Sequence, residues 1–507
     1  MIVVLQLDAV NLPLFHRLGE QRRLSVTSAL RERGRWYALE SPVSSLEGAT
    51  FHSLYSGLRP QRHGLYFPFM WSAPDQRVKL EQEFPGPEPV WDRIGRADRR
   101  SLIIDPHEGR RPQSMAGLGL SGWQFRHPVN LYAWSVPAGV ERQLRRRFGR
   151  PSLVEEVYGR PSWSYLSRMR DRLLAAPARV ADVVTHALGR ESFDLVWVTI
   201  LSGHVAGHWF FDPSRLPQTG IDRRQRDLLE TALVESYTAV EDAMARILSV
   251  IPPDADVIVL SSSGMGPNAS RTHLLPAMLQ AVLSGGPRDP RGSAGPPGGS
   301  LWRLRAMLPV GLRAWVARVL PDRLTLELTA RLEMRGVDWA RTRAFMPPSG
   351  DCGYVRLNLR GRERDGIVDP ADADAILAEI ESGLTTFCDP DGRPAVENVD
   401  RASTILGSDT PLPHFPDLIV RWNPDVPPPL SGVRSTRYGE VPSAGWGSGR
   451  TGEHTGDAWA VVVPGRSRLA PPRPTPHIVD IAATVCAVLG VDTEGLDGEP
   501  LLLPADR

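Results

Sequence analysis

The 507-residue chain has almost no lysine, and its charge is balanced. Lys79 is the sole lysine among 59 basic residues, and the remaining basic residues are arginines scattered along the sequence. Against them stand 58 acidic residues, which leaves a net charge of +1. A protein that holds DNA, RNA or an anionic membrane through its overall field needs a clear excess of positive charge. The composition therefore argues against nucleic acid and against a membrane as partners.

Cysteine is also scarce. Cys352, Cys388 and Cys486 lie far apart with no CxxC spacing, which excludes a disulfide framework and a cysteine-rich zinc site. The amino-terminal run has no basic segment and reaches Asp8 after seven residues, too soon for a signal peptide or a membrane helix. A chain of this length with 41% hydrophobic residues can bury a large core without disulfides or structural metal ions. We expect a cytoplasmic globular protein.

Short apolar runs alternate with longer amphipathic patterns along the chain. Two helices are predicted, over Leu228 to Leu248, where apolar residues recur every three or four positions, and over Ile478 to Leu489, which stops at Gly490. This alternation predicts an α/β fold with a mostly parallel sheet sandwiched between helices. Six runs are predicted as strands: Ile2 to Leu7, Ser101 to Ile104, Leu195 to Ile200, Val257 to Leu260, Leu418 to Val420 and Ala458 to Val463.

The middle of the chain interrupts this alternation. Residues 284–300 are rich in Gly and Pro and are expected to form a flexible loop. The basic amphipathic stretch 302–321 follows, either as a lid helix packed on the body or as a helix on a membrane surface. Pro309 and Gly311 interrupt it, which favours the packed lid. We predict a first core part over 1–283, an inserted cap region over 284–417, and a part over 418–507 that completes the core.

Polar residues with metal-binding chemistry follow several of the predicted strands. Asp8 ends the first, His204 and His208 follow the third, and His454 precedes the last. Ligands in such folds bind beyond the carboxyl ends of the strands. A four-residue spacing places His204 and His208 on one face of a helical turn, where both can bind one metal ion. Gly203 and Gly207 weaken a regular helix there, and two hydrogen-bonded loop histidines fit the spacing equally well.

Six fragments follow one another in a distinctive order. They are VVLQLD (3–8), SGLRPQRHG (56–64), the strand and histidine segment 194–210, SSSGMGPN (261–268), GEHTGD (452–457) and the closing segment with DIAATV (480–485) and LDGEPL (496–501). In this order they resemble the alkaline phosphatase superfamily, and most closely its type I phosphodiesterase/nucleotide pyrophosphatase branch. This resemblance implies an alkaline-phosphatase-like fold with an inserted cap, and hydrolysis of a small-molecule phosphate ester or related anion.

The resemblance also implies a metal site. Asp8 matches the first metal-binding aspartate, and His204, His208 and His454 match a three-histidine site that suits zinc with one position open. At the second metal position the Asp and His ligands are replaced by Ser262 and Ser263. Serine hydroxyls are poor zinc ligands, so we expect one zinc ion and a second site that is weak or absent.

The position of the nucleophile is altered. The family's spacing, ten residues before Gly57, leads to Glu47 instead of Thr or Ser, whereas a shifted loop brings in Ser44, Ser45 or Thr50. Glu47 can serve as a general base, bind metal itself, or mark lost chemistry.

Our first hypothesis is a one-zinc hydrolase in which Asp8, Glu47 and Ser45 are the candidate catalytic residues. The alternatives are a binding protein that has lost catalysis, and a transferase acting on a phosphorylated or lipid-linked substrate. The sequence carries no signal for the oligomeric state.

Overall fold

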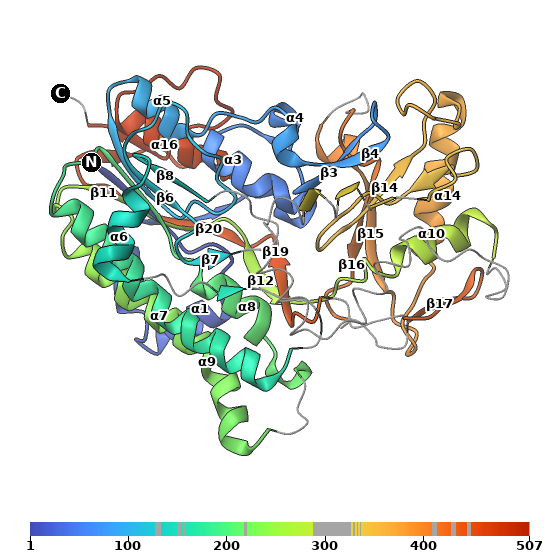
Figure 1. Cartoon of the computed structure of the whole chain (residues 1–507), viewed down its shortest axis with the longest axis horizontal. Helices are drawn as coiled ribbons and strands as arrows, with labels where there is room; N and C mark the ends of the chain where they lie inside the picture. Colours follow the sequence, from blue (N-terminus) through green and yellow to red (C-terminus); the bar gives the residue numbers. More distant parts are fainter. Residues whose placement is uncertain are drawn as a thin grey trace.

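The structure is a computed structural model. It describes the whole chain except residues 127–132, 150–153, 156–158, 160, 217–220, 287–325, 328–329, 332, 335, 408–412, 427–431, 444–447 and 506–507. The predicted lid helix 302–321 and most of the predicted loop 284–300 lie outside the described residues. Figure 1 shows a large sheet with helices at one end of the molecule and a smaller sheet at the other.

The large sheet has eight strands in the order β2-β20-β11-β1-β10-β5-β6-β8. Neighbouring strands from β11 to β6 are parallel, whereas β20 is antiparallel to both β11 and β2, and β8 is antiparallel to β6. The mostly parallel sheet is therefore confirmed. Its strands are β1 (Ile2–Gln6), β2 (Arg35–Leu39), β5 (Arg100–Ile104), β6 (Ala116–Ser121), β8 (Trp134–Val136), β10 (Leu195–Thr199), β11 (Asp256–Ser261) and β20 (Ala458–Val463).

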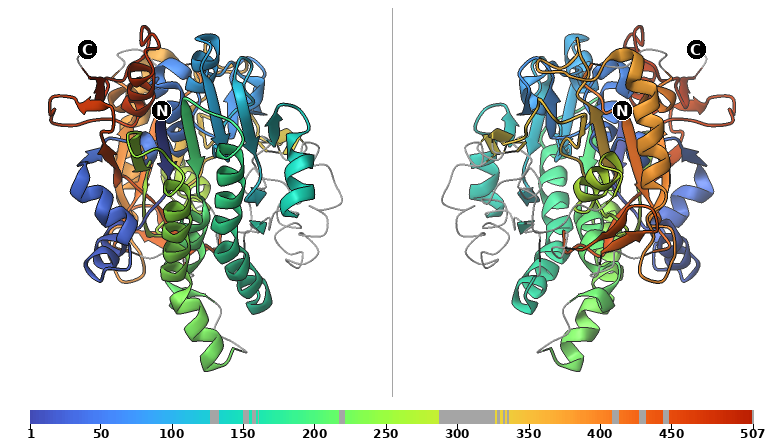
Figure 2. Two further views of the ribbon diagram at one scale, coloured as in Figure 1. Left: turned by 90° about the vertical axis from the view of Figure 1, so that its left-hand side faces the viewer. Right: turned by 90° about the vertical axis from the view of Figure 1, so that its right-hand side faces the viewer.

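Helices cover both faces of this sheet (Figure 2). In β1, Val3 and Leu5 belong to one apolar cluster and Ile2 and Val4 to another, and all four are fully buried. Successive strand side chains point to opposite faces, so a continuous apolar strand needs a cover on each side. The first cluster includes residues of α1 (Leu12–Glu20), α2 (Ser25–Arg33), α6 (Val140–Phe148), α7 (Trp163–Leu188), α8 (Ser202–Phe210) and α9 (Arg223–Leu248), and the second those of α3 (Thr50–Ser56), α5 (Val90–Arg96) and α16 (Val479–Val488).

Both predicted helices exist. α9 begins earlier than predicted because Asp222 and Gln225 form a capping box at its start. α16 ends next to Gly490, which adopts the left-handed conformation (φ 67°) typical of a residue just beyond a helix.

A smaller antiparallel sheet lies at the other end of the molecule, with the order β13-β14-β16-β15. The run predicted at 418–420 is a strand, but it lies in this sheet and not in the large one. Leu418 and Val420 are buried in a cluster with residues of two helices, which explains why the run is apolar. The elements are β13 (Ala344–Phe345), β14 (Gly353–Leu357), β15 (Val396–Arg401), β16 (Leu418–Trp422), α10 (Leu275–Leu283) and α14 (Ala373–Leu384). The three-part domain division stays a prediction.

Short elements complete the described chain. They are α4 (Pro60–His63), α15 (Ala402–Ile405), and the strand pairs β3 (Phe69–Ser72) with β4 (Arg77–Leu80), β7 (Phe125–Arg126) with β9 (Val154–Glu155), β12 (Gly264–Pro267) with β19 (Gly452–Thr455), β17 (Val433–Ser435) with β18 (Gly439–Val441), and β21 (Ser467–Leu469) with β22 (Leu502–Pro504). Among the described residues, no helix combines the length and the apolar character needed to cross a membrane.

Candidate metal centre

Two elements at one edge of the large sheet carry the three predicted metal-binding histidines. α8, which holds His204 and His208, follows β10 directly. β19 holds His454 and precedes β20, and it pairs with β12 so that His454 lies opposite Met265. Because β20 is antiparallel to β11, its beginning lies at the edge where the parallel strands end. The topology thus explains why residues far apart in the sequence meet there.

α8 is a regular helix despite its two glycines. A side-chain carbon at Gly203 would lie 2.9 Å from the Tyr237 ring, and one at Gly207 would lie 2.8 Å from Met265 Cγ. The glycines therefore allow α8 to pack closely against α9 on one side and β12 on the other. This close packing outweighs the low helix propensity of glycine and brings α8 next to the strand pair that carries His454.

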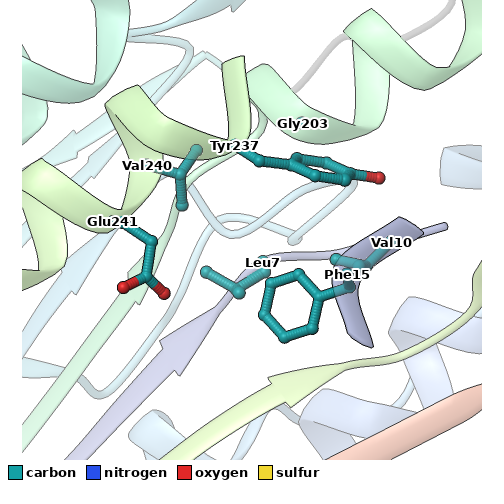
Figure 3. Close-up of a pocket in the computed structure, with 7 residues that line it drawn as sticks. All are labelled: Leu7, Val10, Phe15, Gly203, Tyr237, Val240 and Glu241. Carbon is teal, nitrogen blue, oxygen red and sulfur yellow. The ribbon is translucent and has the colours of Figure 1, made fainter. Parts of the chain in front are cut away.

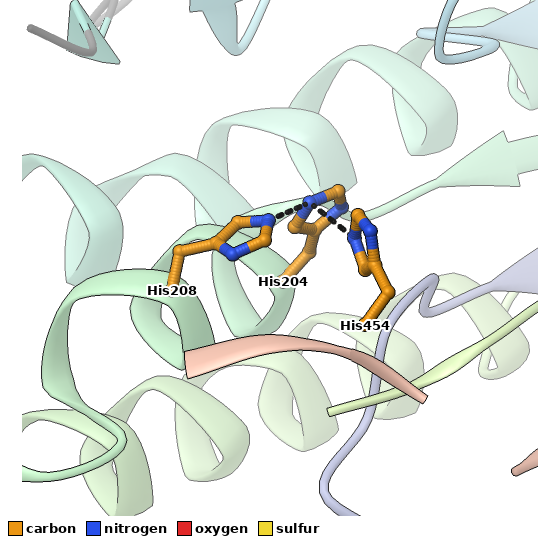
Figure 4. Close-up of side chains that lie close together, drawn as sticks. All are labelled: His204, His208 and His454. Atoms are coloured by element: carbon orange, nitrogen blue, oxygen red, sulfur yellow. Dashed lines mark hydrogen bonds between the residues drawn. The ribbon is translucent and has the colours of Figure 1, made fainter. Parts of the chain in front are cut away.

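The three imidazoles converge through their Nε2 atoms, as Figure 4 shows. His204 Nε2 lies 2.8 Å from His208 Nε2 and 3.3 Å from His454 Nε2. The ring centroids lie 4.7 to 5.0 Å apart, and all three side chains are buried. The three residues therefore form one cluster, which we call the histidine centre.

The other ring nitrogen, Nδ1, is engaged in each histidine. In His204 it contacts Asp8 Oδ2. In His208 it lies 3.0 Å from the Gly452 carbonyl oxygen. A carbonyl oxygen and an ionised carboxylate only accept hydrogen bonds, so these Nδ1 atoms carry a proton, and each ring in its neutral form directs a lone pair from Nε2 into the centre.

The third ring is also held through Nδ1, by two carboxylates. His454 Nδ1 lies 3.1 Å from Glu47 Oε1 and 3.2 Å from Asp351 Oδ2. Three converging lone pairs repel one another unless a cation or shared protons lie between them. The histidine centre therefore has the donor arrangement of a cation site, with each ligand held from behind by an acceptor.

The spacing fits zinc. Two nitrogens bound to one tetrahedral zinc ion at 2.0–2.1 Å lie roughly 3.3–3.4 Å apart. The His204 and His454 Nε2 atoms are separated by 3.3 Å, and the His204 and His208 atoms by 2.8 Å, which a small rotation of one ring would increase. The residues present fit a single ion with three protein ligands and one open position.

Negative charge surrounds the centre. Burial raises the pKa of Asp8, but the ion pair with His204 outweighs it and brings the pKa down to about 2. Burial likewise opposes ionisation of Glu47, yet its contact with His454, helped by Arg450, lowers the pKa to about 2. Burial lowers the pKa of His454, but Asp351 and Glu47 raise it well above its ordinary value. Both carboxylates are therefore ionised at neutral pH.

Asp8 occupies a strained backbone position directly after β1. Its φ of 62° is uncommon for a residue other than glycine, and it turns the side chain towards His204. The other carboxylate oxygen, Oδ1, accepts a hydrogen bond of 2.9 Å from Ser262 Oγ. Asp8 therefore supports His204 from behind, and its role as a direct metal ligand stays a prediction.

The predicted second metal position holds hydroxyl groups. Ser262 is fully buried and donates to Asp8, while the Ser263 carbonyl oxygen accepts from Ser261 Oγ at 2.7 Å. His107 forms a further group with Asp8 and His204, whose ligand atoms lie within 4.8 Å of one another.

The candidate nucleophiles lie in different surroundings. Glu47 lies beside the histidine centre and contacts His454. The Ser45 carbonyl oxygen accepts from the Tyr354 hydroxyl at 3.3 Å, and the Ser44 carbonyl oxygen accepts from the Cys352 thiol at 3.2 Å. Thr50 begins α3, and its buried hydroxyl has no hydrogen-bond partner among the described residues. The catalytic roles of these residues stay predictions.

Sequence reasoning missed two carboxylates of the site. Asp351 comes from the inserted region, and no pattern around it points to the core. Glu453, whose Oε1 lies 3.3 Å from His208 Nδ1, is the neighbour of His454 and could have been considered on that ground. His63 braces the chain after α3, because its ring contacts Ser53 Oγ at 3.0 Å and accepts from the Leu65 amide at 3.1 Å.

A small cavity lies behind α8, and Figure 3 shows its lining. It is bounded by Leu7, Val10, Phe15, Gly203, Tyr237, Val240 and Glu241. Its polar groups are engaged within the protein, since Tyr237 accepts from the Asn11 amide and Glu241 accepts from the Val26 and Thr27 amides. We interpret it as a packing gap and not as a substrate site.

Comparison with solved structures places the fold. Alkaline phosphatase PafA is similar with a TM-score of 0.50 at 11% identity, covering 99% of this chain and 98% of that chain. Phosphonoacetate hydrolase from Sinorhizobium meliloti 1021 in complex with phosphonoformate has a TM-score of 0.49 at 14% identity, covering 97% and 95%. Murine ectonucleotide pyrophosphatase/phosphodiesterase 5 has a TM-score of 0.46 at 9% identity, covering 99% of each chain. The similarity to PafA shows that the fold is alkaline-phosphatase-like.

The family follows from the sequence itself. The family described as type I phosphodiesterase/nucleotide pyrophosphatase matches residues 2–427, which is most of the chain. The protein therefore belongs to this family and is a hydrolase of the phosphodiesterase and phosphatase type. No curated protein matches the chain.

Proposed function

We propose that this protein is a zinc-dependent hydrolase of small phosphate esters, with one ion bound by His204, His208 and His454. The observation that carries the proposal is the convergence of three buried Nε2 atoms whose Nδ1 partners are already engaged. Membership of the phosphodiesterase family supports the reaction class. A cytoplasmic location and a small anionic substrate are part of the same proposal.

A bound cation would also offset the negative charge that surrounds the histidine centre. A phosphate ester is an anion, and the ionised carboxylates of Asp8 and Glu47 lie next to the centre. Without a compensating charge they would repel the substrate. When bound, zinc supplies a Lewis acid that withdraws electron density from the phosphoryl group and lowers the pKa of water.

The chain's own residues prepare the site for such an ion. Asp8 keeps the proton of His204 on Nδ1, and the Gly452 carbonyl oxygen does the same for His208, so both rings present an unprotonated Nε2. Ser262 engages the second oxygen of Asp8, which supports one ion in place of two. α8 and the β12–β19 pair hold the rings in a buried environment that limits access of water.

Metal analysis combined with a substrate panel tests the proposal. Protein stripped with a chelator is reconstituted with zinc or manganese, its metal content is measured, and it is assayed on an aryl phosphate, a phosphodiester, a phosphonate and a sulfate. We expect about one zinc ion per chain and zinc-dependent turnover of at least one phosphate ester. A protein that takes up no metal would refute the proposal, and one that binds zinc without any turnover would favour the binding-protein alternative.

A further inference from the structure

His454 is held by two carboxylates that come from separate parts of the chain. Glu47 lies in the connection between β2, a strand of the large sheet, and the helix α3. Asp351 lies in the predicted inserted region, two residues before β14. Glu47 Oε1 and Asp351 Oδ2 lie 3.1 and 3.2 Å from His454 Nδ1, on the ring nitrogen that does not face the other histidines. One imidazole nitrogen is thus shared by two acceptors.

Backbone hydrogen bonds also connect Glu47, Asp351 and His454. The Asp351 amide donates to Glu47 Oε2 at 3.3 Å, and the His454 amide donates to Asp351 Oδ2 at 3.4 Å. Gly350 is fitted to the same carboxylate, because a side-chain carbon there would lie 2.2 Å from Glu47 Oε2. The Gly350 carbonyl oxygen is in turn held by Thr272 Oγ1 at 3.0 Å. The local backbone of the inserted region is therefore shaped around Glu47.

We infer that Glu47 and Asp351 are positioning residues that hold the His454 ring by Nδ1 and so tie the inserted region to the histidine centre. The inference rests on the proposed function. In this inference Glu47, which stands where the family's nucleophile is expected, supports the metal ligand His454.

We base this assignment on the contacts of the two Glu47 carboxylate oxygens. One oxygen contacts His454 Nδ1 and the other accepts from the Asp351 amide, so both are engaged away from the three Nε2 atoms. Side chains that hold a metal-binding histidine from behind typically change metal affinity by 10–100-fold when they are mutated. A general base that does not touch the ion, by contrast, acts on the chemical step and leaves metal affinity unchanged.

Zinc affinity separates the two roles. We would measure the zinc dissociation constant by competition with a chromogenic chelator for the wild type, Glu47→Gln, Asp351→Asn and the double variant. Each single change should weaken zinc binding about 10-fold, and the double variant about 100-fold or more, since either carboxylate can partly replace the other. At saturating zinc, the turnover rate of Glu47→Gln should stay within about 10-fold of the wild-type rate.

Two controls accompany this experiment. Asp365→Asn removes an exposed carboxylate of the same inserted region that pairs with Arg364, and it should leave zinc affinity unchanged. Asp351→Glu keeps the charge and should bind zinc more tightly than Asp351→Asn. Melting temperatures identify any variant that fails to fold, and the Glu47→Gln series does not depend on the Asp351 variants.

The outcomes are distinct. Wild-type zinc affinity in the double variant would overturn the inference and leave the proposed function intact. The same conclusion would follow if Glu47→Gln kept its zinc affinity but turned over substrate about a thousand-fold more slowly at saturating zinc, a loss on the order of that for a removed base. A wild-type protein that binds no zinc would refute the proposed function and the inference together.

Discussion

His204 and His454 face each other through Nε2 atoms 3.3 Å apart, although 250 residues separate them in the chain. His454 belongs to a short strand paired with β12, and His204 to a helix packed against that strand through Gly207. The distance between the two rings therefore depends on how closely α8 and β12 approach. Chemistry at this site is coupled to the packing of β12, which contributes no ligand itself.

Removing one ligand should strongly weaken zinc binding at the histidine centre. We expect His208→Ala to weaken zinc binding by about 100-fold or more, because two imidazoles alone bind the ion far less tightly. Hydrolysis of a phosphodiester should fall in parallel. His186→Ala, at the end of α7 and in contact with Phe148, is the matched control and should retain both properties. Retained turnover in His208→Ala would contradict the proposed role of the centre.

Asp8→Asn should reduce zinc affinity about 10-fold while leaving the fold intact. Asparagine tolerates the left-handed backbone conformation at this position, and the Ser262 hydroxyl can rotate to accept from the new amide. Asp8→Ala should lower the melting temperature as well, because alanine is strained at positive φ by about 1–2 kcal/mol. Chelator competition and thermal melts of both variants test this pair of expectations.

Gly207→Ala should disturb the centre without touching a ligand. The added carbon would lie 2.8 Å from Met265 Cγ, so α8 and β12 must move apart. We expect a loss of about 1–3 kcal/mol in the free energy of unfolding, together with weaker zinc binding. Gly19→Ala, in α1, meets only Ser28 Oγ at 3.8 Å and serves as the control. Equal zinc affinity in both variants would mean that the α8 contact does not set the ring spacing.

Stability should fall in mild acid because of His477. Burial, together with the nearby Arg59, lowers the pKa of His477 to about 4 in the folded protein, whereas the ordinary value is 6.5. The neutral ring is preferred in the fold, so its contribution is complete above pH 6.5 and is lost as the pH falls towards 4. The change amounts to roughly 3 kcal/mol at most.

His477→Asn isolates this effect, because its side-chain oxygen can accept from the Val479 amide in place of Nδ1 but does not titrate. Between about pH 7.5 and pH 4 the melting temperature of the wild type should fall more than that of the variant, since only the wild type loses this contribution. Parallel curves would exclude His477 as the cause.

Much of the fold could be predicted because buried parallel strands are continuously apolar. β1 and β10 stand out as short apolar runs followed by polar residues, and α9 by its helical periodicity. The sheet to which a run belongs is a different matter. β16 has the apolar sequence of a strand of the large sheet, but it pairs with β14 and β15. An apolar pattern predicts that a strand is buried, but it does not predict the strand with which it pairs.

The histidines were predictable as candidates because each adjoins a strand, but their convergence required a resemblance to a known family. The supporting residues were not predictable in the same way. Asp351 approaches His454 through the tertiary fold of the inserted region, and neither spacing nor composition marks it. The regularity of α8 was also underestimated, because the reason for Gly203 and Gly207 lies in Tyr237 and Met265, which belong to other elements.

The placement of His454 on β19, long after the other two rings, has a consequence for biosynthesis. While the chain emerges from the ribosome, the first strands and α8 are available early, yet the third imidazole appears only when most of the protein has been made. Premature termination anywhere in the inserted region would thus yield fragments that cannot form the complete centre. The complete histidine centre would therefore assemble only in the final stage of synthesis.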